Sequence, residues 1–507
     1  MLLSSLLLIP FLGCLALMVW PGSPSPGRLR QITIVILVAQ LILSLVTAAQ
    51  FDPTAPGLQL QEHHSWVPGI GLDYALGVDG LSLPLVLING ALTLVSAVIT
   101  RDISKRPRLY FAMLLLISGA VNGAFLADNL LLFFLFYELE LIPLWLLISI
   151  WGGVQRAYAA TKFLIFTATS GVLILAAFLG LAVLTGRVDF SLTPVTAETL
   201  SMGGQLLLLI PLLIGFGIKI PLVPFHNWLP DAHTQASTPV SVLLAGVLLK
   251  LGTYGLLRFC LGLFPEAWAL LAPGLALWAA VSVLYGSLAA IAQRDMKRMV
   301  AYSSVGHMGY ILLAASASTA VSLLGAVFQM VSHGLISALL FLLVGIVYRK
   351  TGTRDLDVLR GLLNPERGLP LTGTLMIIGV MASAGLPGMA GFIAEFLVFQ
   401  GSLIAYPLAT LLCMVGSGLT AVYFLLLVNR AFFGRLAITP PQNPIEDARL
   451  DVRLIGVAPR ETIPAMAIAI AIISLGLLPW GLGHLSEFST TAMASGLIAA
   501  VSGAGAS

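Results

Sequence analysis

The sequence predicts an all-α integral membrane protein of about fourteen spanning helices, and three observations support this fold class. The 507 residues are 58% hydrophobic and only 9% charged, whereas soluble domains are about 25% charged. Apolar runs of about 20 residues, the length that crosses a bilayer as a helix, recur along the chain. Lys and Arg gather in alternate connections between these runs. Lipid must therefore cover most of this chain.

The apolar runs give the expected helices in order. Their boundaries lie near 2–20, 31–50, 81–100, 109–126, 129–151, 160–184, 205–229, 238–262, 267–292, 299–316, 321–348, 371–400, 403–433 and 462–482. The first run lacks the basic residues that precede the apolar core of a signal peptide, which favours a first spanning helix. No connection is long enough for a second domain with its own core. We therefore expect a single transmembrane domain over 1–507.

The charges in the connections predict an orientation. Most of the 25 Lys and Arg residues follow odd-numbered helices, and those that follow even-numbered helices are Arg187 and Arg258. Connections rich in Lys and Arg stay on the cytoplasmic side of a membrane. We therefore expect the odd connections on the cytoplasmic or stromal side. Both termini are then expected on the lumenal or periplasmic side.

Ionisable side chains inside the expected spans are candidate functional residues, because burial in lipid is costly. They are Glu138, Glu140, Lys162, Lys219, Lys250, His307, His333 and Glu395. A rise of about 1.5 Å per residue places Glu138, Lys219, Lys250 and His333 near mid-membrane. Lys, Glu and His joined by water suffice as a proton relay without a cofactor.

Three of these residues leave an alternative open. Lys162 lies only two residues into its span, where a snorkelling side chain at the interface explains it as well as a functional role does. Glu140 is two positions from Glu138, so on a continuous helix it faces about 200° away and does not share a site with it. A hydrogen-bonded packing role is the alternative for His307.

Two expected helices are interrupted beside a buried charge. Residues 215–224 read Gly-Phe-Gly-Ile-Lys-Ile-Pro-Leu-Val-Pro around Lys219, and residues 384–388 read Ala-Gly-Leu-Pro-Gly ahead of Glu395. Proline breaks a helix, and transporters place ion sites at broken helices, often once in each of two inverted repeats. The two helices are the seventh and the twelfth, five apart. This spacing predicts inverted five-helix repeats over 109–262 and 267–433.

Four segments carry a resemblance to a known family. They are residues 219–233 (Lys-Ile-Pro-Leu-Val-Pro-Phe-His-Asn-Trp-Leu-Pro-Asp-Ala-His), 248–258, 293–309 and 329–334. The chain resembles, over essentially its whole length, the antiporter-like proton-pumping membrane subunits of complex I. It looks most like chain M (subunit 4, the D chain of cyanobacterial and plastid NDH-1). Glu395 stands where sister chains carry Lys, and no long lateral helix is expected after the last span.

The resemblance implies roles for the buried residues. Glu138 and Lys219 would be a switch pair, Lys250 the central relay, His307 and His333 the connecting file, and Glu395 the last relay. Of the same motif, His226, Asp231 and His233 are further candidates. In the family, reduction of quinone, plastoquinone in photosynthetic membranes, drives proton translocation. The chain is then a translocase subunit of a NAD(P)H- or ferredoxin-quinone oxidoreductase, without a cofactor or metal of its own. Its partners would be lipid and the other membrane-arm subunits, neighbouring antiporter-like chains included.

Two other functions stay open. Ala236-Ser237-Thr238 replaces the family's Ala-Pro-Thr, which leans toward the CO₂-uptake variants of the D chain and a carbonic-anhydrase-like partner. A multisubunit sodium/proton antiporter chain is the other alternative, against which Glu395 argues. His63 and His64 have no third ligand in sight, and we expect no metal site and no nucleic-acid partner. The membrane is expected to be a cyanobacterial thylakoid, otherwise a plasma or plastid membrane.

Overall fold

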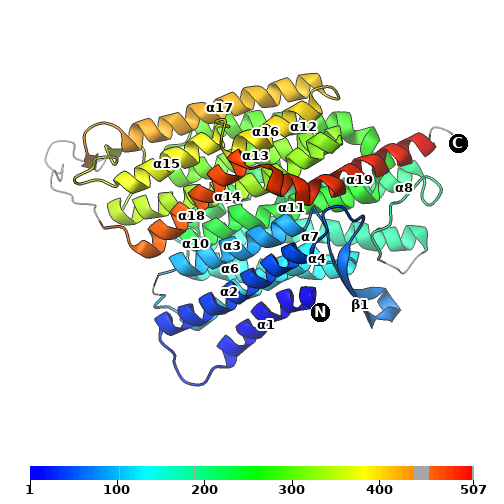
Figure 1. The fold of residues 1–507 in the computed structure, drawn as a ribbon, viewed down its shortest axis with the longest axis horizontal. Helices are drawn as coiled ribbons and strands as arrows, with labels where there is room; N and C mark the ends of the chain where they lie inside the picture. Colours follow the sequence, from blue (N-terminus) through cyan, green and yellow to red (C-terminus); the bar gives the residue numbers. More distant parts are fainter. Residues whose placement is uncertain (102, 187–189, 439–455, 505–507) are drawn as a thin grey trace.

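The computed structural model describes residues 1–101, 103–186, 190–438 and 456–504. Helices lie side by side in a bundle, and one β-hairpin projects from it (Figure 1). Within the described residues, eleven helices are long and apolar enough to cross a membrane. The all-α membrane class is therefore confirmed, while the count of about fourteen crossings stays a prediction.

The first quarter of the chain contains four α-helices and the hairpin. Its elements are α1 (Leu2–Val19), α2 (Pro26–Gln50), β1 (Gln59–Val67), η1 (Pro68–Ile70), β2 (Leu72–Val78), α3 (Leu83–Ile99) and α4 (Pro107–Leu126). The hairpin is antiparallel, and its register pairs Gln59 with Val78 and Val67 with Leu72. The amino group of Met1 forms an ion pair with Glu62 of β1, 2.5 Å away. The N-terminus therefore lies beside the hairpin.

The middle of the chain is more interrupted than expected. Its elements are α5 (Leu130–Leu139), α6 (Leu141–Trp151), α7 (Arg156–Thr185), α8 (Met202–Lys219), η2 (Phe225–Asn227), α9 (Trp228–Gln235), α10 (Thr238–Leu243), the π-helical η3 (Leu244–Leu248), α11 (Leu249–Gly255) and the π-helical η4 (Leu256–Leu261). The predicted break after Lys219 is present. A break between α5 and α6 was not predicted. Pro143 explains it, because proline has no N–H to donate to the carbonyl of Leu139.

The last part of the chain contains the second predicted break. Its elements are α12 (Pro265–Ile291), α13 (Met296–Ala317), α14 (Ala320–Thr351), β3 (Leu359–Arg360), α15 (Pro370–Ser383), α16 (Ala390–Ser402), α17 (Pro407–Phe432), β4 (Ala437–Ile438), α18 (Pro459–Leu477) and α19 (Trp480–Ala504). Gly385 and Gly388 have positive φ values of 71° and 88° between α15 and α16. Glycine adopts this left-handed conformation readily, which lets the chain turn there.

Connections that follow odd-numbered expected helices meet at one end of the bundle. The N–H of Gly153 donates to the carbonyl of Gln235 over 2.8 Å, and the N–H of Met296 donates to that of Arg354 over 3.0 Å. We call this end, formed by residues 152–155, 234–238, 292–298 and 352–369, the odd-loop face. The alternation predicted from the Lys and Arg pattern is therefore present in the packing.

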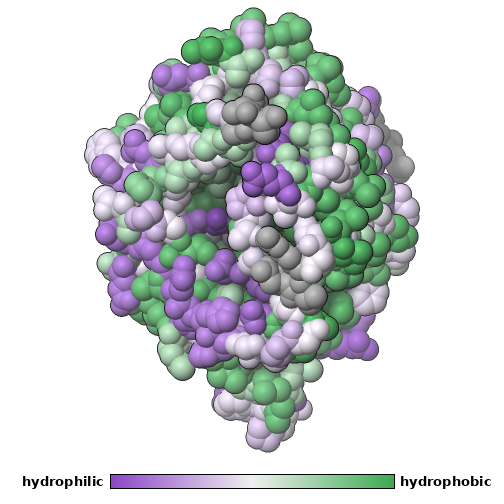
Figure 2. Space-filling view, turned by 90° about the vertical axis from the view of Figure 1, so that its right-hand side faces the viewer, coloured by the Kyte–Doolittle hydropathy of each residue, from purple (hydrophilic) through white to green (hydrophobic). Residues whose placement is uncertain are grey.

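The even-numbered connections meet at the opposite end. The N–H of Asp128 donates to Ala75 over 2.8 Å, and that of Val195 donates to Leu263 over 2.7 Å. We call this end, formed by residues 59–82, 127–129, 190–200 and 262–264, the even-loop face. Figure 2 looks onto the end of the bundle where α19 ends and shows a hollow bordered by hydrophilic residues. Arg187, expected in an even connection, lies outside the described residues.

The helix expected over 462–482 is divided, and α19 was not expected. Glu461, at the start of α18, pairs with Arg349, and Ser489 of α19 accepts a hydrogen bond from Gly80 on the even-loop face. The two helices therefore run in succession from one face to the other. Pro479 separates them because it cannot continue the hydrogen bonds of α18. Ser, Thr and Gly in 480–504 keep this segment below the hydropathy of a recognisable span.

Candidate functional site

A buried ion pair joins two helix breaks. Lys219 is the last residue of α8, and Glu140 stands between α5 and α6. The Nζ of Lys219 donates to Oε1 of Glu140, and the two side chains are 3% and 0% exposed. Nζ also lies 4.6 Å from the ring centroid of Tyr137, which supplies a cation–π contact. The lysine charge is thus held in the interior by a carboxylate and an aromatic face.

The partner of Lys219 differs from the expected one. We expected the pair to be Glu138 and Lys219, but the contacting carboxylate is that of Glu140. Glu138 instead packs against Gly171 of α7, so closely that a Cβ at position 171 would overlap its carboxylate. The 200° separation assumed a continuous helix, and the break at Glu140 removes that assumption. Glu138 nevertheless stays within electrostatic range of Lys219.

Lys250 lies in the second group of buried charges. It is 0% exposed and follows a π-helical turn, a feature that is frequent at functional sites. Its Nζ donates to the carbonyl of Ala245 over 2.6 Å and lies 2.8 Å from Nδ1 of His333. Nε2 of His333 shares a hydrogen bond of 3.0 Å with Ser337. Lysine and histidine are therefore in direct contact.

The file continues from His333 to Glu395. The rings of His333 and His307 have centroids 5.6 Å apart, and Nδ1 of His307 lies 3.8 Å from Oε1 of Glu395. The hydroxyl of Ser417 donates to Oε2 of Glu395 over 2.5 Å. A small cavity among these residues has room for about one water molecule. Lys250, His333, His307 and Glu395 thus form one connected row, which we call the relay row.

The ion pair and the relay row touch through one glycine. A Cβ built on Gly252 of α11 would lie 3.2 Å from the Cβ of Lys219, so the segment that carries Lys250 packs directly on Lys219. Within the described residues, no direct hydrogen bond joins the two lysine side chains. Proton transfer between them would need water or a movement of a side chain.

The remaining predicted residues lie toward the odd-loop face. Lys162 pairs with Asp231 over 2.7 Å, and Arg298 reaches the same carboxylate at 3.4 Å. This ion pair gives Lys162 a partner at the rim of the bundle. His226 and His233 are buried, and their ring nitrogens have no hydrogen-bond partner among the described residues.

A cluster near the even-loop face was missed by the sequence reasoning. Arg258 donates to Asp79 over 2.5 Å and, with Asp128, lines a cleft of roughly 890 Å³ including its open mouth. Burial raises the pKa of Asp79, but the Arg258 guanidinium outweighs it, so the pKa lies below its usual value. Burial raises the pKa of Asp128. Arg258 was assigned to a connection although it lies in η4; its position eight residues after Lys250 was the available signal.

Metal binding needs several ligands that converge. Within the described part of the chain, no group of three or more His, Cys, Asp or Glu side chains is arranged to hold a metal ion. The chemistry that these residues can perform themselves is proton exchange along the relay row.

The sequence is similar to a known family of membrane proteins and to named cyanobacterial relatives. Residues 127–420 match the family described as "NADH:quinone oxidoreductase/Mrp antiporter, TM". The "NAD(P)H-quinone oxidoreductase chain 4 1" of a Synechococcus species is 42% identical over 503 residues, covering 98% of this chain and 93% of that protein. The chain 4 protein of Acaryochloris marina is 38% identical and covers 96% and 91%.

Two solved structures have the same fold. A chain of "Respiratory complex I from Thermus thermophilus with bound NADH" superposes with a TM-score of 0.85 at 27% identity, covering 98% of this chain and all of that one. A chain of the Mrp complex from a Dietzia species superposes with a TM-score of 0.83 at 22% identity, covering 98% and 99%. The second likeness is one of fold alone.

Proposed function

Because the chain belongs to the NADH:quinone oxidoreductase/Mrp antiporter membrane-subunit family, we propose that it is a proton-translocating antiporter-like subunit of an NDH-1 complex. The observation that carries this function is the row of buried ionisable side chains from Lys250 to Glu395, next to the Lys219–Glu140 pair. Buried charges of this kind mark proton paths in membrane proteins.

The contacts between these residues suggest the order in which they transfer a proton. When the Lys219–Glu140 pair opens, Nζ of Lys219 gives up a proton that water carries to Nζ of Lys250. Lys250 passes a proton to Nδ1 of His333, from which it moves through the cavity to His307 and the carboxylate of Glu395. Nζ of Lys219 then takes up a new proton from water, and its return to Glu140 resets the pair. Glu138, within range of Lys219, is the second carboxylate that can stabilise the charge while the pair is open.

The energy comes from a redox reaction elsewhere in the complex. Relatives of this chain are named as subunits of NAD(P)H-quinone oxidoreductase, so quinone reduction is the reaction to which proton movement would be coupled. The other membrane-arm subunits are the partners. The chain is a multi-pass membrane protein; because the relatives are cyanobacterial, we assign it to the thylakoid, with both termini in the lumen.

The experiment uses native membrane vesicles that carry the Lys219→Ala or the Lys105→Ala variant. The rate of donor-driven acidification and the rate of quinone reduction are measured in parallel. Lys105 is an exposed residue near the odd-loop face and serves as the matched control. We expect Lys219→Ala to slow acidification about tenfold or more, since it leaves Glu140 buried without its cation. Lys105→Ala should act like the wild type. Normal acidification by an assembled Lys219→Ala complex would reject the proposed function.

A further inference from the structure

Three arginines gather around one glutamate where α3, α14 and α18 meet. The guanidinium of Arg349, in the last turn of α14, forms an ion pair with Glu461 in the first turn of α18. Nε of Arg101, two residues after α3, lies 3.6 Å from the same carboxylate. Arg460 directly precedes Glu461 in the chain. These four residues, which we call the arginine cluster, lie at the same end of the bundle as the odd-loop face, because α14 ends there.

The arginines of the cluster keep donors that no protein group accepts. Glu461 is 1% exposed and accepts from both terminal nitrogens of Arg349. Arg460 forms no ion pair with a described residue, and Nε of Arg349 and Nε of Arg460 are buried without a hydrogen-bond partner among these residues. Buried polar groups are almost always hydrogen-bonded, so these donors indicate an acceptor from outside the chain.

The surroundings of the cluster add positive charge. Arg30 of α2 donates over 3.3 Å to the backbone carbonyl that precedes Arg101. Asp102 adjoins Arg101 in the sequence and lies outside the described residues. Even when Asp102 is counted with Glu461, four arginines stand against two carboxylates. An anionic ligand would therefore be electrostatically favoured at this place.

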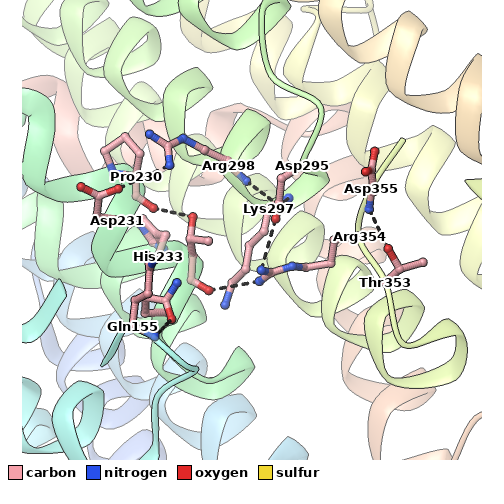
Figure 3. A network of polar contacts seen from close by, with 12 residues as sticks. Gln155, Pro230, Asp231, His233, Asp295, Lys297, Arg298, Thr353, Arg354 and Asp355 are labelled. Atoms are coloured by element: carbon pink, nitrogen blue, oxygen red, sulfur yellow. Dashed lines mark hydrogen bonds and ion pairs between the residues drawn. The ribbon is translucent and has the colours of Figure 1, made fainter. Parts of the chain in front are cut away.

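The middle of the odd-loop face is balanced differently. Figure 3 shows Arg298, Asp231, Arg354 and Asp295 in that region. Arg354 lies 3.2 Å from the carboxylate of Asp295, and Arg298 lies 3.4 Å from that of Asp231. Both arginines thus have an acidic partner of their own chain. The excess of arginine over carboxylate is a property of the cluster beside α18.

An exposed apolar surface begins at the cluster. On α18, the side chains of Ile463, Met466 and Ile470 are 64%, 43% and 61% exposed. Their spacing of three and four residues places them on one side of the helix, starting two residues after Glu461. In a membrane protein such a stripe faces hydrocarbon. Charge and apolar surface therefore follow one another along the same helix, as the head and the tail of a lipid do.

The neighbouring helix α3 continues this surface into a groove. Its partly exposed side chains stand at helical spacing and lead to Arg101; they are Leu87, Ala91, Leu94 and Val98. Helix α18 runs beside α3 and α14 (Figure 1). Apolar residues of these three helices and of α19, Ala91 and Leu475 among them, line a groove of roughly 680 Å³ including its open mouth. Ala91 lies ten residues before Arg101, about 15 Å along the helix, which is about the depth of one leaflet.

We propose that the arginine cluster binds the phosphate of an anionic phospholipid, whose acyl chain lies along α3 and α18 and reaches the groove. Guanidinium groups match phosphate oxygens with paired N–H donors. Basic pockets between spanning helices on the cytoplasmic side bind anionic headgroups in this way. A zwitterionic lipid carries the same phosphate, but its ammonium group would add to the excess of positive charge. The bound lipid would join three helices that are distant in the sequence.

The test uses the assembled complex in phosphatidylcholine vesicles that contain a trace of photoactivatable lipid. The tracer is phosphatidylglycerol or phosphatidylcholine with the reactive group on its acyl chain, and peptide mass spectrometry locates the label. We expect phosphatidylglycerol to label residues 83–99 and 459–477 about fivefold more than phosphatidylcholine does. Arg101→Gln and Arg460→Gln should each lower labelling by phosphatidylglycerol toward the phosphatidylcholine level. Arg349 is kept, because its loss would leave Glu461 buried without a cation.

Arg294→Gln is the matched control. Arg294 lies on the same face, is 78% exposed and pairs with Asp357 over 3.3 Å, so its removal should leave the labelling unchanged. Equal labelling of these segments by the two lipids would overturn the site, and this comparison in the wild type decides if the arginine variants fail to assemble.

Three further outcomes would also reject the lipid site. The first is wild-type labelling by phosphatidylglycerol in both arginine variants, which would mean that the cluster does not hold the headgroup. The second is no label from either lipid, which would mean that another subunit covers this surface. The third is displacement of the phosphatidylglycerol tracer by inorganic phosphate alone, which would mean that the cluster binds phosphate without a lipid.

Discussion

The two broken-helix regions of this molecule hold their buried charge in different ways. At the α8–α9 break, Lys219 is closed in an ion pair with Glu140. At the α15–α16 break, Glu395 accepts a hydrogen bond from Ser417 and lies 3.8 Å from His307, beside a small cavity. Under the proposed function, the first region holds a charge in a contact that must open. The second offers an acid beside a histidine and a cavity large enough for about one water molecule.

The difference follows from where each charge stands relative to its break. Lys219 stands two residues before Pro221, so the helix ends at the charged residue and its side chain meets the second break at Glu140. Glu395 lies within α16, after the break, where its neighbours are residues of α13 and α17. Under the proposed function, an interrupted helix therefore makes the Lys219–Glu140 pair a gate in one place and Glu395 a relay acid in the other.

The largest expected effect comes from removing the carboxylate of Glu140, the partner of Lys219 in the buried ion pair. Glu140→Gln leaves Lys219 buried without a carboxylate, a change that costs about 3–5 kcal/mol when one member of a buried pair is lost. We expect acidification to fall about tenfold or more. Glu138→Gln is the matched variant, and we expect a smaller loss because Glu138 does not contact Lys219. The reverse order would show that Glu138 is the working partner, as the sequence resemblance implies.

The second region should respond less steeply. Glu395→Gln keeps a hydrogen-bond acceptor for Ser417 but cannot take up a proton. We expect acidification to slow roughly fivefold, within the range of a lost proton-transfer group, while the complex stays assembled. Ser417→Ala is its control and should change the rate less than Glu395→Gln does, since it removes one hydrogen bond and leaves the titratable carboxyl group in place. A wild-type rate with Glu395→Gln would remove Glu395 from the path.

The smallest expected effect sharpens the assignment of the gate. Gly171→Ala places a Cβ where the carboxylate of Glu138 lies, so Glu138 must move, while the Lys219–Glu140 contact is untouched. We expect acidification within about twofold of the wild type, because the Lys219–Glu140 contact, on which the proposed gate depends, is unchanged. The rate in vesicles, normalised to assembled complex on a native gel, checks this. A loss as large as that of Glu140→Gln would contradict it.

Some of this site could be predicted from the sequence because the signal is local. Lys219, Pro221 and Pro224 stand within six residues, and a charge beside prolines in an apolar run indicates a broken helix with a function. Glu395 follows Gly385 and Gly388 in the same way. The depth of Lys250 and His333 in their spans likewise follows from counting residues along a helix.

Other features depend on contacts that no local pattern contains. Whether Glu138 or Glu140 faces Lys219 depends on the break before Pro143, which changes the direction of the side chains. Arg258 and Asp79 are 179 positions apart, so their ion pair appears only in the folded chain. The helix α19 was missed because its Ser, Thr and Gly residues hide it from a search for apolar runs.

The central claim is that the gate and the relay row form one path, and Lys250 is the residue that joins them. The direct measurement is the number of protons moved per quinone reduced, in assembled complexes that carry Lys250→Met. Methionine keeps the length of the side chain and removes its proton. The account predicts that proton movement through this chain stops, so that acidification falls to the level of Lys219→Ala and quinone reduction slows with it. A wild-type proton-to-quinone ratio at a wild-type rate would contradict the account.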